Sequence, residues 1–380
     1  MQPDRPLVAA IPVRNEAARI GPCLRALARQ HAARLSHVVL LLNNCTDATL
    51  HTVQALSGRL PFALHVVERT YPPPIAHAGT ARRAAMTCAA ELAGPEGIVL
   101  TTDADAMVAP DWLARTLAAF ATGADAVCGR ALIDPVEAAR LPACLHEDDR
   151  AETAYATMLD RIHDLADPDP HDPWPRHVEH SGASIAVRVG LYHRAGGIPA
   201  VSLGEDRGFL AALRRVDAAI RHAPDVWVSV SGRIAGRARG GMADTMARRL
   251  IRQDEMLDES LEPAMTCLHR ARARAALRAL WSQPVRRALW RERAERLACQ
   301  LMLSPAILMT TCAEPFFGLA WDRVEATSPL LHRRPVRRVG LAAEHQQAAR
   351  IVLRLLHAQA PALSALGGRY RHKAAPFEVF

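Results

Sequence analysis

Aromatic residues make up only 4% of this 380-residue chain, and Lys373 is its only lysine. The chain is nevertheless basic, with a formal net charge of +8, because arginine is abundant. A basic chain favours anionic partners such as a nucleotide diphosphate, a membrane surface or a nucleic acid. No basic patch is interleaved with aromatic residues, the pattern typical of nucleic-acid binding, so we expect no nucleic-acid partner.

The eight cysteines include no CxxC pair and no spacing typical of a zinc site or a disulfide framework. Most of them lie in apolar surroundings, which predicts reduced structural thiols in a cytoplasmic protein. The first five residues lack the basic-then-apolar order of a signal peptide, and no apolar run is long enough to span a bilayer. We therefore expect a soluble cytoplasmic protein, with a peripheral position at the inner face of the membrane as the alternative.

Apolar runs alternate with segments of helical periodicity over the first hundred residues. Four of the runs are typical of buried strands: 7–12, 38–42, 63–67 and 98–102. The first three are each followed by a segment whose pattern predicts a helix, beginning near residues 20, 48 and 79. This alternation predicts an α/β fold with a mostly parallel, Rossmann-like sheet flanked by helices.

Beyond this region we expect two more strands, at 124–129 and 182–187, and helices at 136–165 and 204–216. The segment between the first of these helices and the second strand, 164–175, is acidic and rich in proline. A lid and a simple linker remain open as interpretations of that loop. Trp174 in the loop is either a platform for a sugar ring or an anchor that packs the loop down.

Strand patterns fade from about residue 243 onward, and Arg/Ala/Leu-rich helices dominate at 265–280, 285–303 and 342–356. We expect two units, an α/β domain at 1–242 and a helical extension at 243–380. The arginines are interpreted as solvated faces of amphipathic helices, or as a basic platform for anionic lipid.

Two carboxylates one residue apart, Asp103 and Asp105, end the apolar run at 98–102. Because alternate residues of a strand lie on the same side, both carboxylates are expected to converge on one hard cation. Two carboxylates completed by phosphate oxygens are a donor set that suits Mg²⁺ or Mn²⁺. The sequence therefore predicts a divalent metal at this strand end.

Other polar groups follow the neighbouring strands, and the carboxyl ends of parallel strands share one edge of a sheet. Glu16 and Asp47 are acceptors suited to a nucleobase or to ribose hydroxyls. Arg82 and Arg83 lie near the start of a predicted helix, where their charge suits phosphate groups. The combination describes a metal-assisted site for a nucleoside diphosphate.

Five motifs in order carry a resemblance: IPVRNE at 11–16, NCTDAT at 44–49, GTAR at 79–82, TDAD at 102–105 and GED at 204–206. Over residues 6–240 the chain resembles the family 2 glycosyltransferases of the GT-A fold. The resemblance implies an inverting enzyme that uses a nucleotide-diphosphate sugar and Mn²⁺ or Mg²⁺. The acceptor that it implies is unspecified and could be a small molecule, a lipid or a saccharide.

The resemblance also implies roles for individual residues. Metal binding falls to Asp105 and Asp103, the latter with ribose as an alternative partner, and catalysis to Glu205 and Asp206, with Asp206 as the base. Nucleotide-sugar contacts fall to eight residues: Pro12, Arg14, Glu16, Asn44, Asp47, Arg82, Asp103 and Ala104.

An inverting transfer needs one base to deprotonate the acceptor hydroxyl as it attacks the anomeric carbon. A carboxylate such as Asp206 suits that task. Taken alone, Glu205 and Asp206 are also explained as acidic residues that complement a helix dipole.

Three departures from the family pattern matter. Arg14 stands where tyrosine is common, and Arg83 stands where asparagine is usual. No Gln-x-x-Arg-Trp motif follows the Glu-Asp pair, which argues against a processive polysaccharide synthase.

The alternative readings come from other classes of protein. A non-catalytic scaffold of the same fold is disfavoured by the intact Asp103, Asp105 and Asp206. A metal-dependent phosphohydrolase of the haloacid dehalogenase type is disfavoured by Met107 and by the near absence of lysine. A nucleotidyltransferase would need a glycine-rich loop near the N-terminus, which this chain lacks.

Overall fold

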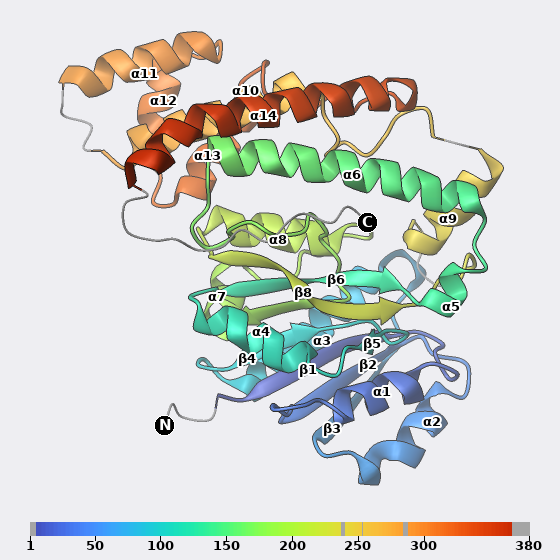
Figure 1. Ribbon diagram of the computed structural model, residues 1–380. Helices are drawn as coiled ribbons and strands as arrows, with labels where there is room; N and C mark the ends of the chain where they lie inside the picture. The colour runs from blue at the N-terminus through green and yellow to red at the C-terminus, as the bar shows by residue number, and fades with distance from the viewer. Residues whose placement is uncertain (1–4, 237–239, 253, 284–287, 367–380) are drawn as a thin grey trace.

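The computed structural model describes residues 5–236, 240–252, 254–283 and 288–366, with a mixed sheet at its centre (Figure 1). The strands of this part of the chain are β1 (Leu7–Val13), β2 (His37–Asn43), β3 (Ala63–Arg69), β4 (Ile98–Thr101), β5 (Met107–Val108), β6 (Ala126–Ile133), β7 (Ile185–Arg188) and β8 (Ile220–Val230). They form one eight-stranded sheet in the order β3-β2-β1-β4-β7-β6-β8-β5.

The N-terminal half of the sheet is parallel. β1 lies between β2 and β4, with Ala10 opposite both Val39 and Thr101, and β3 extends the sheet beyond β2. β1, β2 and β4 are buried along almost their whole length, as expected where helices cover both faces. The four strands predicted from the apolar runs are therefore confirmed.

The other half of the sheet is mixed. β7 is antiparallel to β4 and β6, while β6 and β8 run parallel and β5 pairs antiparallel with β8. Four of the seven neighbouring pairs are thus parallel, which agrees with the expected α/β class and its mostly parallel sheet.

Helices cover both faces of the sheet and continue into a C-terminal layer. Their bounds are α1 (Ile20–Ala28), α2 (Thr49–Leu56), α3 (Ala78–Ala93), α4 (Trp112–Ala121), α5 (Pro135–Ala138), α6 (Ala143–Ala166), α7 (Val189–Arg194), α8 (Glu205–Arg215), α9 (Met242–Ile251), α10 (Ala264–Trp281), α11 (Ala288–Gln300), α12 (Pro305–Thr311), α13 (Phe317–Thr327) and α14 (Leu341–Leu366). Three short 3₁₀ turns lie at Ser57–Arg59, Pro73–Ile75 and Arg338–Gly340.

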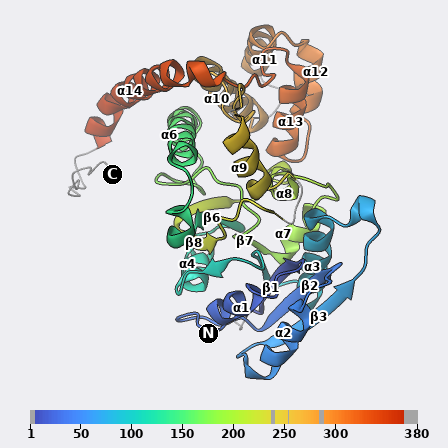
Figure 2. The same cartoon turned by 90° about the vertical axis from the view of Figure 1, so that its right-hand side faces the viewer.

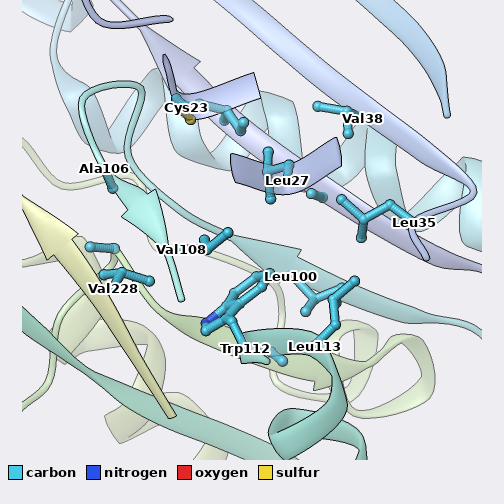
Figure 3. Packing of buried hydrophobic residues seen from close by; sticks show 14 of the residues in the cluster. Cys23, Leu27, Leu35, Val38, Leu100, Ala106, Val108, Trp112, Leu113 and Val228 are labelled. Atoms are coloured by element: carbon cyan, nitrogen blue, oxygen red, sulfur yellow. The ribbon is translucent and has the colours of Figure 1, made fainter. Parts of the chain in front are cut away.

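Alternation along the strands divides the core in two. Ala9 and Leu40 lie in a cluster with α1, α2 and α4, whereas Ala10 and Val39 lie in a second cluster with α3, α7 and α8. Figure 3 shows the first cluster, where Trp112 at the start of α4 lies close to Leu100. The two faces explain why strands of this sheet read as continuous apolar runs.

The C-terminal helices pack on α6, at the end of the molecule opposite to β2, β3 and α2 (Figures 1 and 2). Tyr155 and Ile162 of α6 share one buried cluster with Cys267 of α10 and Ile351 of α14. None of the helices in the described ranges is both long and apolar enough to span a membrane. The C-terminal helical layer expected from the sequence is therefore present, and the boundary near residue 242 stays a prediction.

Some local expectations differ from the structure. The helix expected at 136–165 is two helices, α5 and α6, because Pro142 stands between them and N-caps the second. β8 and the short β5 were not expected. Residues 1–4 and the predicted helical start at 285–287 lie outside the described residues.

The acidic, proline-rich loop after α6 is fastened to the fold. Asp172 accepts from the backbone N–H of His222 at 2.9 Å and pairs with its ring at 2.7 Å. Asp167 pairs with Arg274 and Arg278 of α10. The guanidinium of Arg161 covers the Trp174 ring at 4.8 Å, which favours the anchor interpretation of that tryptophan.

Candidate active site

The Asp103-Ala104-Asp105 motif lies in a turn. β4 ends at Thr101, and the turn is closed by a hydrogen bond from the Ala106 N–H to the Asp103 carbonyl, 3.1 Å. Ala104 and Ala106 are buried in the core cluster, while the side chains of Asp103 and Asp105 remain 35% and 16% exposed. The expectation that strand alternation aligns the two carboxylates was wrong, because the strand ends before them; the turn places them instead.

Arg82 of α3 connects this turn to the start of α8. Its guanidinium donates to Asp103 at 2.7 Å and to Glu205 at 3.1 Å, and also to the hydroxyl of Thr101 at 2.8 Å. Burial lowers the pKa of Arg82, but the charges of Asp103 and Glu205 outweigh it, and the net shift is upward. Arg82 is therefore a buried, permanently charged link between two of the predicted site carboxylates.

Gly182, just before β7, adds a second link. Its carbonyl accepts from Arg82 at 2.8 Å, and its N–H donates to the Asp206 carboxylate at 3.0 Å. A Cβ on Gly182 would lie 2.7 Å from Cζ of Arg82, so a larger residue here would force the guanidinium to shift. The turn after β4, α3 and α8 are thus joined around one backbone residue.

Glu205 and Asp206 are neighbours with different surroundings. Glu205 is buried and bound to Arg82. Asp206 is partly exposed, and its carboxylate accepts hydrogen bonds from the backbone N–H groups of Gly182 and Arg207. Asp206 is the carboxylate of the pair that a second molecule could reach, whereas Glu205 serves to hold the arginine.

The loops after β1 and β2 interlock at the same edge of the sheet. Asn15 accepts from the N–H groups of Thr46 and Asp47, and Asp47 accepts from those of Ala17 and Thr49. Asn15 and Asn44 have φ near +50°, a conformation that asparagine tolerates better than most residues. These two predicted binding loops are thus brought together by their own side chains.

Two other predicted residues, Asn44 and Arg14, have structural partners in these loops, and a third, Pro12, lies in β1. The Asn44 amide exchanges two hydrogen bonds with the backbone of Tyr71, at 2.9 and 3.0 Å. Arg14 is exposed and donates to the Ala76 carbonyl at 2.7 Å. Pro12 is half-buried near the end of β1, and the contacts of all three with a nucleotide stay predictions.

Arg233 was missed by sequence reasoning. It follows β8 and binds Glu16 with both terminal nitrogens, at 2.7 and 3.1 Å, while one of them lies 3.1 Å from Asp105. No motif marks Arg233, and β8, which carries it to the site, was not predicted. The structure thus brings Glu16 and Asp105 together through an arginine more than a hundred residues away from both in the chain.

Asp105 has a surplus of negative charge around it. The pKa of Asp105 is raised to about 6, first by burial and then by the charge of Asp103; Arg233 opposes this rise, and Glu16 adds to it. The carboxylate also borders an open cavity of about 290 Å³ lined by Ala18, Arg19, Pro22 and Met107. A desolvated carboxylate beside two others, facing open space, is a donor set that fits a divalent cation.

Two histidines outside this edge, His177 and His222, pack against each other. His177 and His222 pack edge to face, 5.6 Å apart, and the His177 ring bonds the Cys128 carbonyl. Burial lowers the pKa of His177 to about 4, so it is a neutral, packed side chain near neutral pH.

An α/β protein with its acidic and basic side chains gathered at the carboxyl edge of parallel strands belongs to a broad class of nucleotide-handling folds. Residues 9–161 match the family model described as Glycosyl transferase family 2. The matched segment, which contains the turn at Asp103 and Asp105 and the arginine Arg82, is thus similar to glycosyl transferase family 2. No curated protein matches the chain in a sequence comparison.

Solved structures with a similar fold share little sequence with this chain. TarS from S. aureus in complex with UDP-GlcNAc is 16% identical, with a TM-score of 0.46 and coverage of 96% of this chain and 93% of TarS. The mannosyltransferase PcManGT from Pyrobaculum calidifontis, with GDP-Man and Mn²⁺, is 18% identical, with a TM-score of 0.43 and coverage of 96% and 88%. Glucosyl-3-phosphoglycerate synthase from Mycobacterium tuberculosis is 17% identical, with a TM-score of 0.41 and coverage of 66% and 78%.

Proposed function

We propose that this protein transfers a sugar from a nucleotide-diphosphate sugar to an acceptor hydroxyl, with inversion and without processive elongation. The observation that carries the proposal is the connection of Asp206 to the Asp103-Ala104-Asp105 turn through Gly182 and Arg82. It holds a reachable carboxylate at a fixed place beside the group of carboxylates that fits a cation. The family match supports the same reaction class.

Asp206 is the proposed base. Its two backbone hydrogen bonds fix the orientation of the carboxylate without placing another side chain on it. It would take the proton of the acceptor hydroxyl as that oxygen attacks the anomeric carbon. Glu205 keeps Arg82 in place and does not contact the acceptor.

Asp105 and Asp103 would hold Mn²⁺ or Mg²⁺. A divalent cation bound there would stabilise the negative charge that develops on the departing diphosphate. Arg82, already bound to Asp103, would keep that carboxylate oriented, and its contact with the diphosphate is part of the proposal. Pro12, Arg14, Glu16, Asn44 and Asp47, with Ala104 of the turn, would form the rest of the donor site.

The arginines of the C-terminal helices differ in whether an anionic membrane surface could reach them. Three arginines of α10 form internal ion pairs: Arg270 with Glu262, and Arg274 and Arg278 with Asp167. A basic platform for anionic lipid would therefore depend on other arginines, such as the exposed Arg291 and Arg293 of α11. We propose such a peripheral contact only as one way to reach a lipid acceptor at the inner face of the membrane.

A thermal-shift screen tests the proposal. The protein is titrated with UDP-, GDP- and dTDP-sugars, each with and without Mn²⁺ or Mg²⁺, and a true donor raises the melting temperature by mass action. We expect one base to stabilise the protein, more strongly with metal. No shift with any nucleotide would favour a non-catalytic module of the same fold.

A further inference from the structure

The guanidinium of Arg233 binds the two carboxylates that the donor site would need most. Both oxygens of Glu16 accept from it, and Asp105 lies 3.1 Å from one of its nitrogens. The side chain is 26% exposed, and that of Glu16 only 6%. The ion pairs of Arg233 therefore lie within the site and are not exposed surface pairs.

The segment that carries Arg233 is held on both sides. Glu137 of α5 accepts from the Ser231 hydroxyl at 3.1 Å and from the Gly232 N–H at 2.8 Å. Arg19, which lines the cavity beside Asp105, donates to the same carboxylate at 2.7 Å. A Cβ on Gly232 would lie 2.8 Å from Ile133, so the backbone is packed closely there.

Two arginines at the site are divided among three carboxylates. Arg82 pairs with Asp103, and Arg233 pairs with both Glu16 and Asp105. Asp105 therefore depends on a guanidinium that also binds both carboxylate oxygens of Glu16. A divalent cation that binds Asp105 and Asp103 would have to share Asp105 with the guanidinium or displace it.

We propose that Arg233 is a positioning residue of the donor site that competes with the divalent cation for Asp105 and holds Glu16 when no donor is bound. The inference rests on the proposed function for the identity of the cation site. Arg233 keeps the carboxylates from repelling each other in the free protein, at the cost of weaker binding of the cation alone. Tight binding of the cation then requires the diphosphate, which supplies further oxygen ligands.

The competition is measured with Mn²⁺ alone, by the loss of the free-ion electron paramagnetic resonance signal during titration. Arg233→Gln removes the charge and is expected to bind Mn²⁺ about tenfold more tightly than the wild type, because a charge at hydrogen-bond distance from Asp105 is lost. Arg233→Lys keeps the charge but not the bidentate geometry, so its affinity for Mn²⁺ should lie between those of the wild type and Arg233→Gln.

Arg115→Gln is the matched control. Arg115 also bridges two carboxylates, Asp111 and Asp225, but on the exposed surface of α4. The Arg115→Gln variant should bind Mn²⁺ with the affinity of the wild type. Circular dichroism should show that all variants are folded. Unchanged or weaker Mn²⁺ binding in Arg233→Gln, including no binding at all, would overturn the competition.

A second titration separates this inference from the proposed function. With UDP or GDP present, the gain from Arg233→Gln should shrink, because the diphosphate then contributes to cation binding in every variant. If no nucleoside diphosphate binds the wild type, the proposed function fails, while the comparison with Mn²⁺ alone still decides the role of Arg233.

Discussion

Two buried arginines in different regions of the molecule have similar chemistry and different surroundings. Arg82 at the sheet edge pairs with Asp103 and Glu205, and Arg270 in the C-terminal helical layer pairs with Glu262 and Glu325. The side chain of Glu262 is 1% exposed, whereas that of Asp103 is 35% exposed. A buried arginine with two carboxylates therefore does not by itself indicate a functional site; access to one of the carboxylates does.

The surroundings of Arg270 also disfavour a cation. His163, Glu262 and Cys267 place possible ligand atoms within 4.8 Å of one another. Burial, and after it the charges of the nearby guanidinium groups, lower the pKa of His163 to about 3. The positive charge that repels a proton there would also repel a metal ion. At the sheet edge the opposite holds, because Asp105 lies beside two more carboxylates.

Asp206→Asn should have the largest effect, and only on chemistry. Without a base at this position, kcat should fall by about 10²–10⁴-fold, while donor binding and the melting temperature change little. Steady-state kinetics with the donor identified by thermal shift provide the measurement. Asp322→Asn, which removes an exposed partner of Arg215, is the control, and full activity in Asp206→Asn would disprove the base assignment.

Arg270→Met should act on stability alone. It leaves Glu262 buried without its bidentate partner, and breaking such a pair costs about 3–5 kcal/mol of the free energy of unfolding. Urea unfolding measures this loss, and Arg215→Met at an exposed pair should cost about 1 kcal/mol or less. A loss in Arg270→Met no larger than that of the surface control would contradict the interpretation of Arg270 as a structural group.

Arg82→Lys should lower both catalytic activity and stability, each by less than the two preceding substitutions do. Lysine keeps the charge but cannot reach Asp103, Glu205, Thr101 and Gly182 together. We expect kcat/KM to fall about 10–100-fold, the loss typical of misplaced groups in a site, with a smaller loss of stability than in Arg270→Met. If stability fell as much as in Arg270→Met and the folded enzyme kept its kinetics, Arg82 would be a structural residue like Arg270.

The smallest effect concerns pH. The raised pKa of Asp105, about 6 against 3.8 for the ordinary group, means that its ionised form is disfavoured in the folded protein. In the absence of metal, the protonated Asp105 carboxyl group therefore contributes to the stability of the folded protein. This contribution is fully present below about pH 4 and is lost as the pH rises through about 6. Because a cation needs the ionised carboxylate, Mn²⁺ should raise the melting temperature by more at about pH 7 than at about pH 5.

Thermal scans with and without Mn²⁺ at the two pH values measure this difference. Asp105→Asn removes the titrating group and should abolish the pH dependence of the shift. An equal Mn²⁺ effect at both values in the wild type would show that Asp105 does not bind the ion.

The parallel half of the fold and its strand-end residues were predictable because they depend on local signals. The apolar runs that became β1, β2 and β4 are buried on both faces, and polar residues follow each one. β8 was not predictable in the same way. Its buried positions alternate with Arg221, Asp225 and other polar residues, and Pro224 interrupts the pattern.

The parts of the site that depend on β8 were missed for the same reason. Arg233 reaches Glu16 because β8 pairs with β6 near one edge of the sheet, a long-range contact that no local sequence pattern predicts. The pairing of Glu205 with Arg82 was also not visible in the sequence. The Glu-Asp pair reads as two equivalent acids until the fold buries one of them.

Gly182 has a consequence for mechanical coupling within the site. One amino acid there accepts from Arg82 through its carbonyl and donates to Asp206 through its N–H. A displacement of the Asp103 turn that pulls on Arg82 is therefore transmitted through a single backbone unit to the proposed base. Gly182 therefore couples the position of the proposed cation site at the Asp103 turn to the position of the proposed base, Asp206.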